Sequence, residues 1–157
     1  MSAIENLLEG NGIPYFFAVT ETGSRVLPAN AYQSYAVRRT DGVTLSREES
    51  VEIINSAVLV ECEFPGVTSA GQCDHHRPGD VGFSRPPSEY WEASSIGQVA
   101  AFLDGNHGHD ILSGGDGKRL ALIAAADHCL AAAMAGRCPG VDPEELAAEH
   151  AYLPKAS

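Results

Sequence analysis

The sequence predicts an α/β fold: a single layered domain, residues 1–157, with a mixed sheet flanked by helices. The first observation is that short apolar or aromatic segments, typical of strands, alternate with longer segments that begin at helix-capping residues. The second is size, because 157 residues with 44% hydrophobic side chains supply enough apolar surface for one core and too little for two. The third is a charged fraction of 20%, which is ordinary for a folded protein.

Strands are predicted where apolar and β-branched residues are bounded by turn residues. Residues 13–20, IPYFFAVT, follow Gly12 and precede a turn that contains glycine. Residues 56–62, SAVLVEC, form a short continuous apolar run, which is typical of a strand buried on both faces. Two further extended segments are expected at 23–27 and 31–39. These segments would supply the mixed sheet.

Helices are predicted from their start and stop signals. The first covers about 46–55, because Ser46 is followed three residues later by Glu49, which is a capping-box pattern. The others are expected at 94–103 with Ser94 as N-cap, at 118–135 between a cap at Asp116 and a stop at Gly136, and after Asp142, with Pro143 at the first helical position. Residues 63–93 and 104–117 are rich in glycine and proline and should be mostly irregular, and so long an irregular segment is usually functional.

Charge and cysteine usage restrict the class of protein. A net charge of -11 repels a phosphate backbone, so broad nucleic-acid binding is not expected. The N-terminus lacks the pattern of a signal peptide, and the longest apolar run is too short and too polar to cross a bilayer, so we expect a cytoplasmic protein with no membrane partner. The cysteines would then be thiols or metal ligands rather than disulfides: Cys62, Cys73, Cys129 and Cys138.

The irregular segment 63–93 concentrates the polar chemistry of the chain. It contains the consecutive residues Asp74, His75, His76 and Arg77. Carboxylate and imidazole together suit cations such as Mn²⁺, Zn²⁺ or Fe²⁺. The planar guanidinium of Arg77 is well shaped to hold a phosphate, although a salt bridge with Asp80 is an equally good interpretation.

Asp127 is unusual because it interrupts an apolar helix. Its neighbours three and four residues away are apolar: Ile123, Ala124, Leu130 and Ala131. A carboxylate on such a face requires a partner, since an unpaired buried charge is costly. His128 follows directly, and small alanines around both residues leave room for another element or a ligand. We therefore expect Asp127 to meet a metal, a cation or a hydrogen-bond network.

The triplet Asp74-His75-His76 resembles the signature of the DHH phosphoesterase superfamily, which includes RecJ-type nucleases and family II pyrophosphatases. Three further stretches resemble that family: VLVEC, which ends near Glu61 where the family has aspartate, SSIGQV as the helix after the triplet, and LIAAAD, which ends in Asp127. The Asp-x-Asp motif near the N-terminus of the family has no counterpart in residues 13–45. The resemblance implies that the matched residues bind two Mn²⁺ or Mg²⁺ ions, which activate a water for phosphoester or phosphoanhydride cleavage.

These observations predict a metal-dependent hydrolase of a phosphorylated small molecule, with a nucleotide as the favoured substrate. The predicted cofactor is a divalent cation, Mn²⁺ or else Mg²⁺ or Zn²⁺, and the chain is free to form a homo-oligomer. The predicted metal ligands are Asp74, His75, Asp127, Glu61 and His128. His76 is predicted to be a ligand or proton shuttle, and Arg77 to hold the anion.

Two other functions fit the same residues. The first is a non-enzymatic zinc-binding domain with four ligands: Cys73, His75 or His76, His128 and Cys129. The second is an interaction or inhibitor module that binds no metal and contacts its partner through the polar loop. The glycine-rich loop with His107 and His109 is interpreted as an exposed turn.

Overall fold

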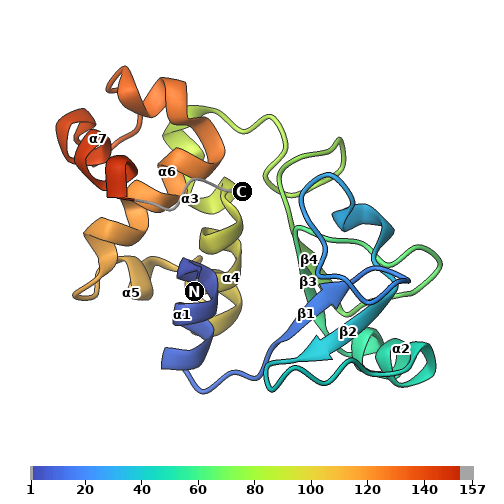
Figure 1. Ribbon diagram of the computed structural model, residues 1–157. Helices are drawn as coiled ribbons and strands as arrows, with labels where there is room; N and C mark the ends of the chain where they lie inside the picture. Colours follow the sequence, from blue (N-terminus) through green and yellow to red (C-terminus); the bar gives the residue numbers. More distant parts are fainter. Residues whose placement is uncertain (1, 153–157) are drawn as a thin grey trace. The chain divides into compact units, whose positions relative to one another are not determined.

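The computed structural model describes residues 2–152, with side chains through Glu149. The chain forms two compact units, Met1–Asp74 and His75–Ser157. Among residues 2–152, the first unit contains the four strands and the second contains helices and loops (Figure 1). Whether the two units unfold together is a thermodynamic property, so the single-domain organisation stays a prediction.

The first unit is built from two small sheets. Strand β1 (Phe16–Val19) pairs antiparallel with β2 (Ala36–Arg39), with Val19 opposite Ala36, and β3 (Val58–Val60) pairs parallel with β4 (Gly71–Cys73). Helix α2 (Arg47–Asn55) contacts β2 and begins at the predicted cap, where the Ser46 hydroxyl accepts the Glu49 N–H. The hydrophobic core of this unit includes the buried residues Val37, Ile54, Leu59 and Phe64.

Within residues 2–152, the prediction of a mixed α/β protein is confirmed, and the prediction of a single mixed sheet is wrong. The structure is mostly helical, and its two sheets have two strands each. The expected strand at 31–39 begins instead with a 3-10 helix, η1 (Ala31–Gln33). The expected strand at 23–27 contributes an isolated bridge at Arg25, and its Leu27 N–H donates to the Asn30 side chain. Local side-chain hydrogen bonds of this kind compete with the ladder of a sheet.

Some elements of the first unit are absent from the sequence predictions. Helix α1 (Ala3–Gly10) has a full capping box, in which the Ser2 hydroxyl accepts the Glu5 N–H and the Glu5 carboxylate accepts the Ser2 N–H. Strand β4, GQC, has no apolar run or alternation to predict it. It forms because its backbone completes the ladder of β3.

The second unit is a cluster of helices around α6. Its elements are η2 (Pro87–Glu89), α3 (Tyr90–Ala93), α4 (Ser95–Asp104), α5 (His109–Leu112), α6 (Gly117–Met134) and α7 (Pro143–Tyr152). All of them except α6 itself contact α6 (Figure 1). The interior is lined by Trp91, Leu146 and the small residues Ala124 and Ala125, which let neighbouring helices approach closely.

The predicted helices of this unit are confirmed, with two corrections. Ser94 caps α4 by accepting the Gly97 N–H, and α7 begins at Pro143 with the Asp142 carboxylate accepting the Glu144 N–H. Asp116 precedes α6 but makes no side-chain capping hydrogen bond. Helix α6 is also not continuous, because Cys129 has a non-helical backbone with φ -153° and ψ 56°. Over residues 2–152, no helix combines the length and apolar character needed to cross a membrane.

Candidate metal-binding site

Two predicted carboxylate ligands belong to the first unit. Glu61 follows β3, and its N–H donates to the Cys73 carbonyl at 3.0 Å. Its φ of 53° lies in the left-handed region, which is strained for a residue other than glycine and is often found at functional sites. Asp74 follows β4, is 1% exposed and accepts a hydrogen bond of 2.8 Å from the Tyr32 hydroxyl. The strand ends of β3 and β4 therefore each deliver a carboxylate.

The second unit brings together three of the predicted ligands. His75 Nε2 lies 3.3 Å from Asp127 Oδ2, and His75 Nδ1 lies 3.1 Å from His128 Nδ1. The His75 side chain is 5% exposed. On the other side of its ring, His128 Nε2 lies 2.8 Å from the Arg85 carbonyl. These contacts form one continuous chain of polar groups that ends at a carboxylate on one side and at a backbone carbonyl on the other.

The hydrogen atoms that these contacts require can be counted. A carbonyl only accepts, so His128 Nε2 must carry a hydrogen. The contact between the two Nδ1 atoms requires one further hydrogen. These two requirements are met by two hydrogens on two neutral rings, which leaves His75 Nε2 without a hydrogen, 3.3 Å from Asp127 Oδ2. A proton or a cation at Nε2 would make this contact favourable.

The position of Asp127 differs from the prediction in one respect. The sequence places this carboxylate on an apolar face, whereas its side chain is 38% exposed. The departure of Cys129 from helical geometry interrupts the regular spacing on which that expectation was built. The expected partner is present, because Asp127 contacts His75. The buried member of this pair is the imidazole and not the carboxylate.

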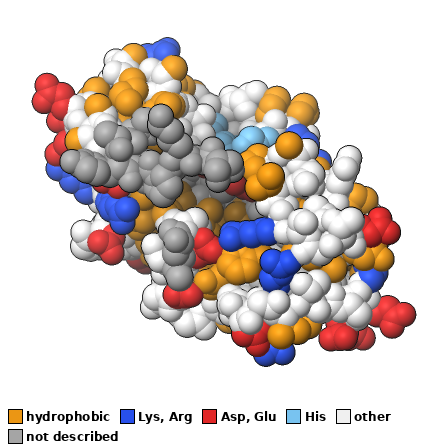
Figure 2. Space-filling view, viewed as in Figure 1, with side chains coloured by type: hydrophobic (Ala, Val, Ile, Leu, Met, Phe, Trp, Pro, Cys, Tyr) orange, Lys and Arg blue, Asp and Glu red, His pale blue; other side chains and the backbone are white. Residues whose placement is uncertain are grey.

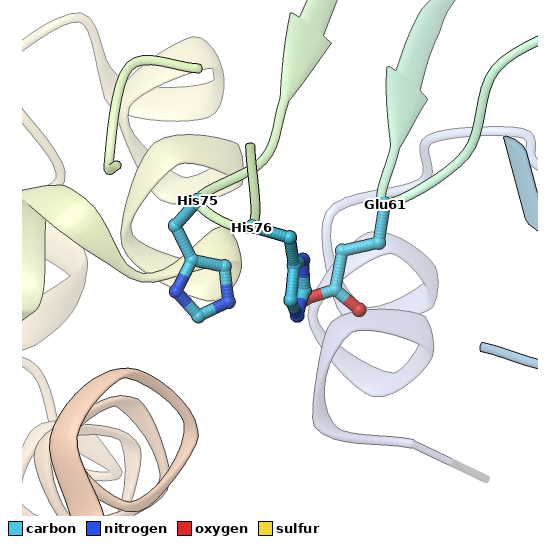
Figure 3. A group of neighbouring side chains, drawn as sticks. All are labelled: Glu61, His75 and His76. Carbon is cyan, nitrogen blue, oxygen red and sulfur yellow. The ribbon is translucent and has the colours of Figure 1, made fainter. Parts of the chain in front are cut away.

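Figure 3 shows three side chains that carry metal-binding atoms: Glu61 from the first unit, and His75 and His76 from the second. Carboxylate oxygen and imidazole nitrogen are ligand types that could hold a metal ion. His76 is exposed, and its ring centroid lies 4.3 Å from that of His75. The Arg77 N–H donates to the Asp80 carboxylate at 2.8 Å, which closes the RPGD turn after the histidines.

The cysteines named for the alternative zinc site, Cys73 and Cys129, belong to different units of the chain. Cys73 is buried in the first unit, and burial raises the pKa of its thiol to about 12. Cys129 Sγ lies 3.2 Å from Cys138 Sγ. Burial and the contact with Cys138 raise the pKa of the Cys129 thiol to about 12. In the metal-free protein both thiols therefore keep their protons at neutral pH, and zinc binding to them would release these protons. The four-ligand zinc site stays an alternative prediction.

Two cations of the second unit already form ion pairs. Arg85 forms an ion pair with Glu89 at 2.9 Å, and Lys118 pairs with Glu145. On the face drawn in Figure 2, acidic side chains occupy several separate places, in keeping with the net charge of -11. In the glycine-rich loop, the backbone carbonyl of His107 accepts the Trp91 indole N–H, and the His109 ring lies 3.8 Å from the Glu92 carboxylate.

Two residues near the candidate site carry no ligand signature in the sequence. A Cβ atom added to Gly82 would lie 2.0 Å from the Ala93 carbonyl oxygen and 2.6 Å from His75 Cβ, so this close approach requires glycine. Arg85 contributes its backbone carbonyl, which any residue could supply. The turn-rich composition of residues 78–87 was the available signal for both.

The comparisons with known proteins found no matching family model, curated protein or solved structure.

Proposed function

We propose that this protein is a metal-dependent hydrolase of a phosphorylated small molecule, with a divalent cation held by His75 Nε2 and Asp127 Oδ2. The observation that carries the proposal is their separation of 3.3 Å. Nitrogen and oxygen ligands each lie about 2.1 Å from a bound Zn²⁺, so two adjacent ligands of one ion are about 3 Å apart. This separation suits two ligands of one ion, and a cation there would make the contact between His75 Nε2 and the Asp127 carboxylate favourable.

The resemblance to DHH phosphoesterases supports the type of chemistry. It matches His75 and Asp127 to metal-binding positions of that family and favours Mn²⁺ or Mg²⁺. When bound, such an ion lowers the pKa of a coordinated water and stabilises negative charge on a phosphoryl oxygen. Glu61 and Asp74 remain predicted ligands, each to be tested by substitution.

The residues around this pair have distinct proposed roles. His76 is exposed beside His75, so its ring is open to exchange protons with solvent or substrate. Arg77 is proposed to hold the phosphate of the substrate through its guanidinium. The acidic character of the chain favours a small anion, such as a nucleotide, over a polynucleotide.

The proposal is tested first by metal binding. Titration of metal-free protein with Mn²⁺ should show saturable binding and a melting temperature that rises with Mn²⁺ concentration. Asp127→Asn and His75→Gln should each weaken binding by more than the roughly 10- to 100-fold typical of outer-sphere partners. Asp116→Asn is a matched control, because Asp116 is an exposed carboxylate before α6 without a side-chain capping bond. It should bind Mn²⁺ as the wild type does.

Activity is tested with the same variants. A screen of nucleotides with added Mn²⁺ should show phosphate release by the wild type and by Asp116→Asn, and none by Asp127→Asn. Metal binding without any turnover would favour the zinc-binding domain, and neither binding nor turnover would favour the interaction module. Wild-type turnover that persists in Asp127→Asn would remove Asp127 from the site.

A further inference from the structure

We infer that His128 is a positioning residue, which holds the His75 ring for the ion and is not itself a ligand. The inference rests on the proposed metal site and adds a role that the residue types alone do not reveal. In the sequence, His128 is as good a ligand candidate as His75, since both are imidazoles near carboxylates. The contacts of the two rings distinguish them.

Both nitrogens of His128 are already engaged within the second unit. Nδ1 lies 3.1 Å from His75 Nδ1, and Nε2 donates to the Arg85 carbonyl over 2.8 Å. An ion at either nitrogen would displace one of these contacts. By contrast, His75 presents Nε2 to the carboxylate of Asp127. The geometry therefore gives His75 the metal-facing nitrogen and His128 the supporting one.

The acceptor that orients His128 is itself well supported. Arg85 lies in a hydrogen-bonded turn, in which its N–H donates to the Gly82 carbonyl at 3.4 Å and its Nε–H to the Val81 carbonyl at 3.2 Å. Its guanidinium also pairs with Glu89. These bonds keep the carbonyl in place, so that Nε2 rather than Nδ1 of His128 carries the hydrogen in the neutral ring.

This tautomer determines what His75 can do. A neutral His128 with hydrogen on Nε2 has a lone pair on Nδ1, which accepts the Nδ1–H of His75. His75 is then left with its lone pair on Nε2, which is the form that binds a cation. Outer partners that orient a ligating histidine in this way are typically worth 10- to 100-fold in metal affinity.

Three substitutions separate the two hydrogen bonds of His128. His128→Asn keeps an acceptor near the place of Nδ1, His128→Gln keeps a donor near the place of Nε2, and His128→Leu keeps neither. We expect the His128→Asn variant to keep the Mn²⁺ affinity of the wild type within about 3-fold. The His128→Gln and His128→Leu variants should bind Mn²⁺ about 10- to 100-fold more weakly than the wild type. His109→Leu, at an exposed histidine of the same unit, should leave the affinity unchanged.

A second measurement does not depend on the metal. The shared hydrogen between the two rings should give a protected imidazole N–H signal in proton NMR spectra of the metal-free protein, identified by its loss in His75→Gln. The signal should remain in His128→Asn and disappear in His128→Leu and His128→Gln. Wild-type Mn²⁺ affinity in His128→Leu would overturn the inference and leave the proposed metal site standing. Absence of Mn²⁺ binding in the wild type, with the signal present, would instead overturn the proposed metal site and the inference with it.

Discussion

Asp74 and Tyr32 show how one side chain can hold a buried carboxylate at the end of a strand. Asp74 is 1% exposed and lies directly before His75 in the chain. The hydroxyl of Tyr32, which is 42 residues away in sequence, donates to its Oδ2 at 2.8 Å. A buried polar group that loses a hydrogen-bond partner destabilises the folded state. Tyr32 therefore supports the strand end from which the histidines follow.

Tyr32→Phe removes only this hydroxyl. We expect the free energy of unfolding to fall by about 1 to 3 kcal/mol, the usual range for a buried hydrogen bond to a group of this kind. Urea denaturation followed by circular dichroism measures the change. Tyr15→Phe is the control, since the Tyr15 hydroxyl donates to Glu9 at the surface and its loss should cost less than about 0.5 kcal/mol. Equal effects in both variants would contradict the supporting role of Tyr32.

Among the elements, the turn around Gly82 and the helix α6 together form the surroundings of His75. Helix α6 carries Asp127 and His128, and the turn supplies the Arg85 carbonyl and the close approach at Gly82. The non-helical backbone at Cys129 begins directly after this pair of residues. The site therefore depends on an irregular segment packed against a distorted helix, and small changes of backbone shape should affect it.

Gly82→Ala tests this dependence. The added methyl group would meet the Ala93 carbonyl oxygen at 2.0 Å and His75 Cβ at 2.6 Å, so the turn and His75 must move apart. Overpacking of this kind typically costs about 1 to 3 kcal/mol. We expect a lower melting temperature and weaker Mn²⁺ binding.

Gly115→Ala is the matched control, because a methyl group there has nothing within 4 Å and its backbone is not in the left-handed region. It should leave both the melting temperature and the Mn²⁺ affinity unchanged. A Gly82→Ala protein that resembles the control in both measurements would show that the approach to His75 is not required.

For the whole molecule, each unit has its own apolar interior, and the first contains two buried thiols. Burial raises the pKa of Cys62 to about 11 and that of Cys73 to about 12, from an ordinary value of 9.0. The unfolded chain therefore loses these protons at lower pH than the folded chain does. The resulting stabilisation is complete below about pH 9 and is lost as the pH rises through the folded pKa values.

The expected result is a free energy of unfolding that falls between about pH 9 and about pH 12. Urea denaturation at a series of pH values measures the fall. A double variant, Cys62→Ala with Cys73→Ala, should be less stable at neutral pH because it loses core contacts, but it should show a shallower decline in alkali. Parallel declines in the wild type and the double variant would show that other groups cause the alkaline loss.

Local chemistry explains which parts of the fold could be predicted. Three helices begin where the sequence predicts: after the N-caps Ser46 and Ser94, and at Pro143. These starts could be predicted because a start signal and its helix lie within a few residues of each other. The prediction of a single mixed sheet was wrong, because strand pairing depends on residues that are far apart in the chain. Strand β4 makes the point, since its short polar sequence becomes a strand only through its pairing with β3.

The candidate site divides in the same way. By itself, the sequence identified the imidazoles and carboxylates and predicted that Asp127 needs a partner, because residue type and helical spacing are local properties. Only the tertiary structure decided that the partner is His75 and that His128 turns one nitrogen to His75 and the other to the Arg85 carbonyl. These contacts join residues 43 to 53 positions apart, and a carbonyl has no residue-type signature, so no local pattern encodes them.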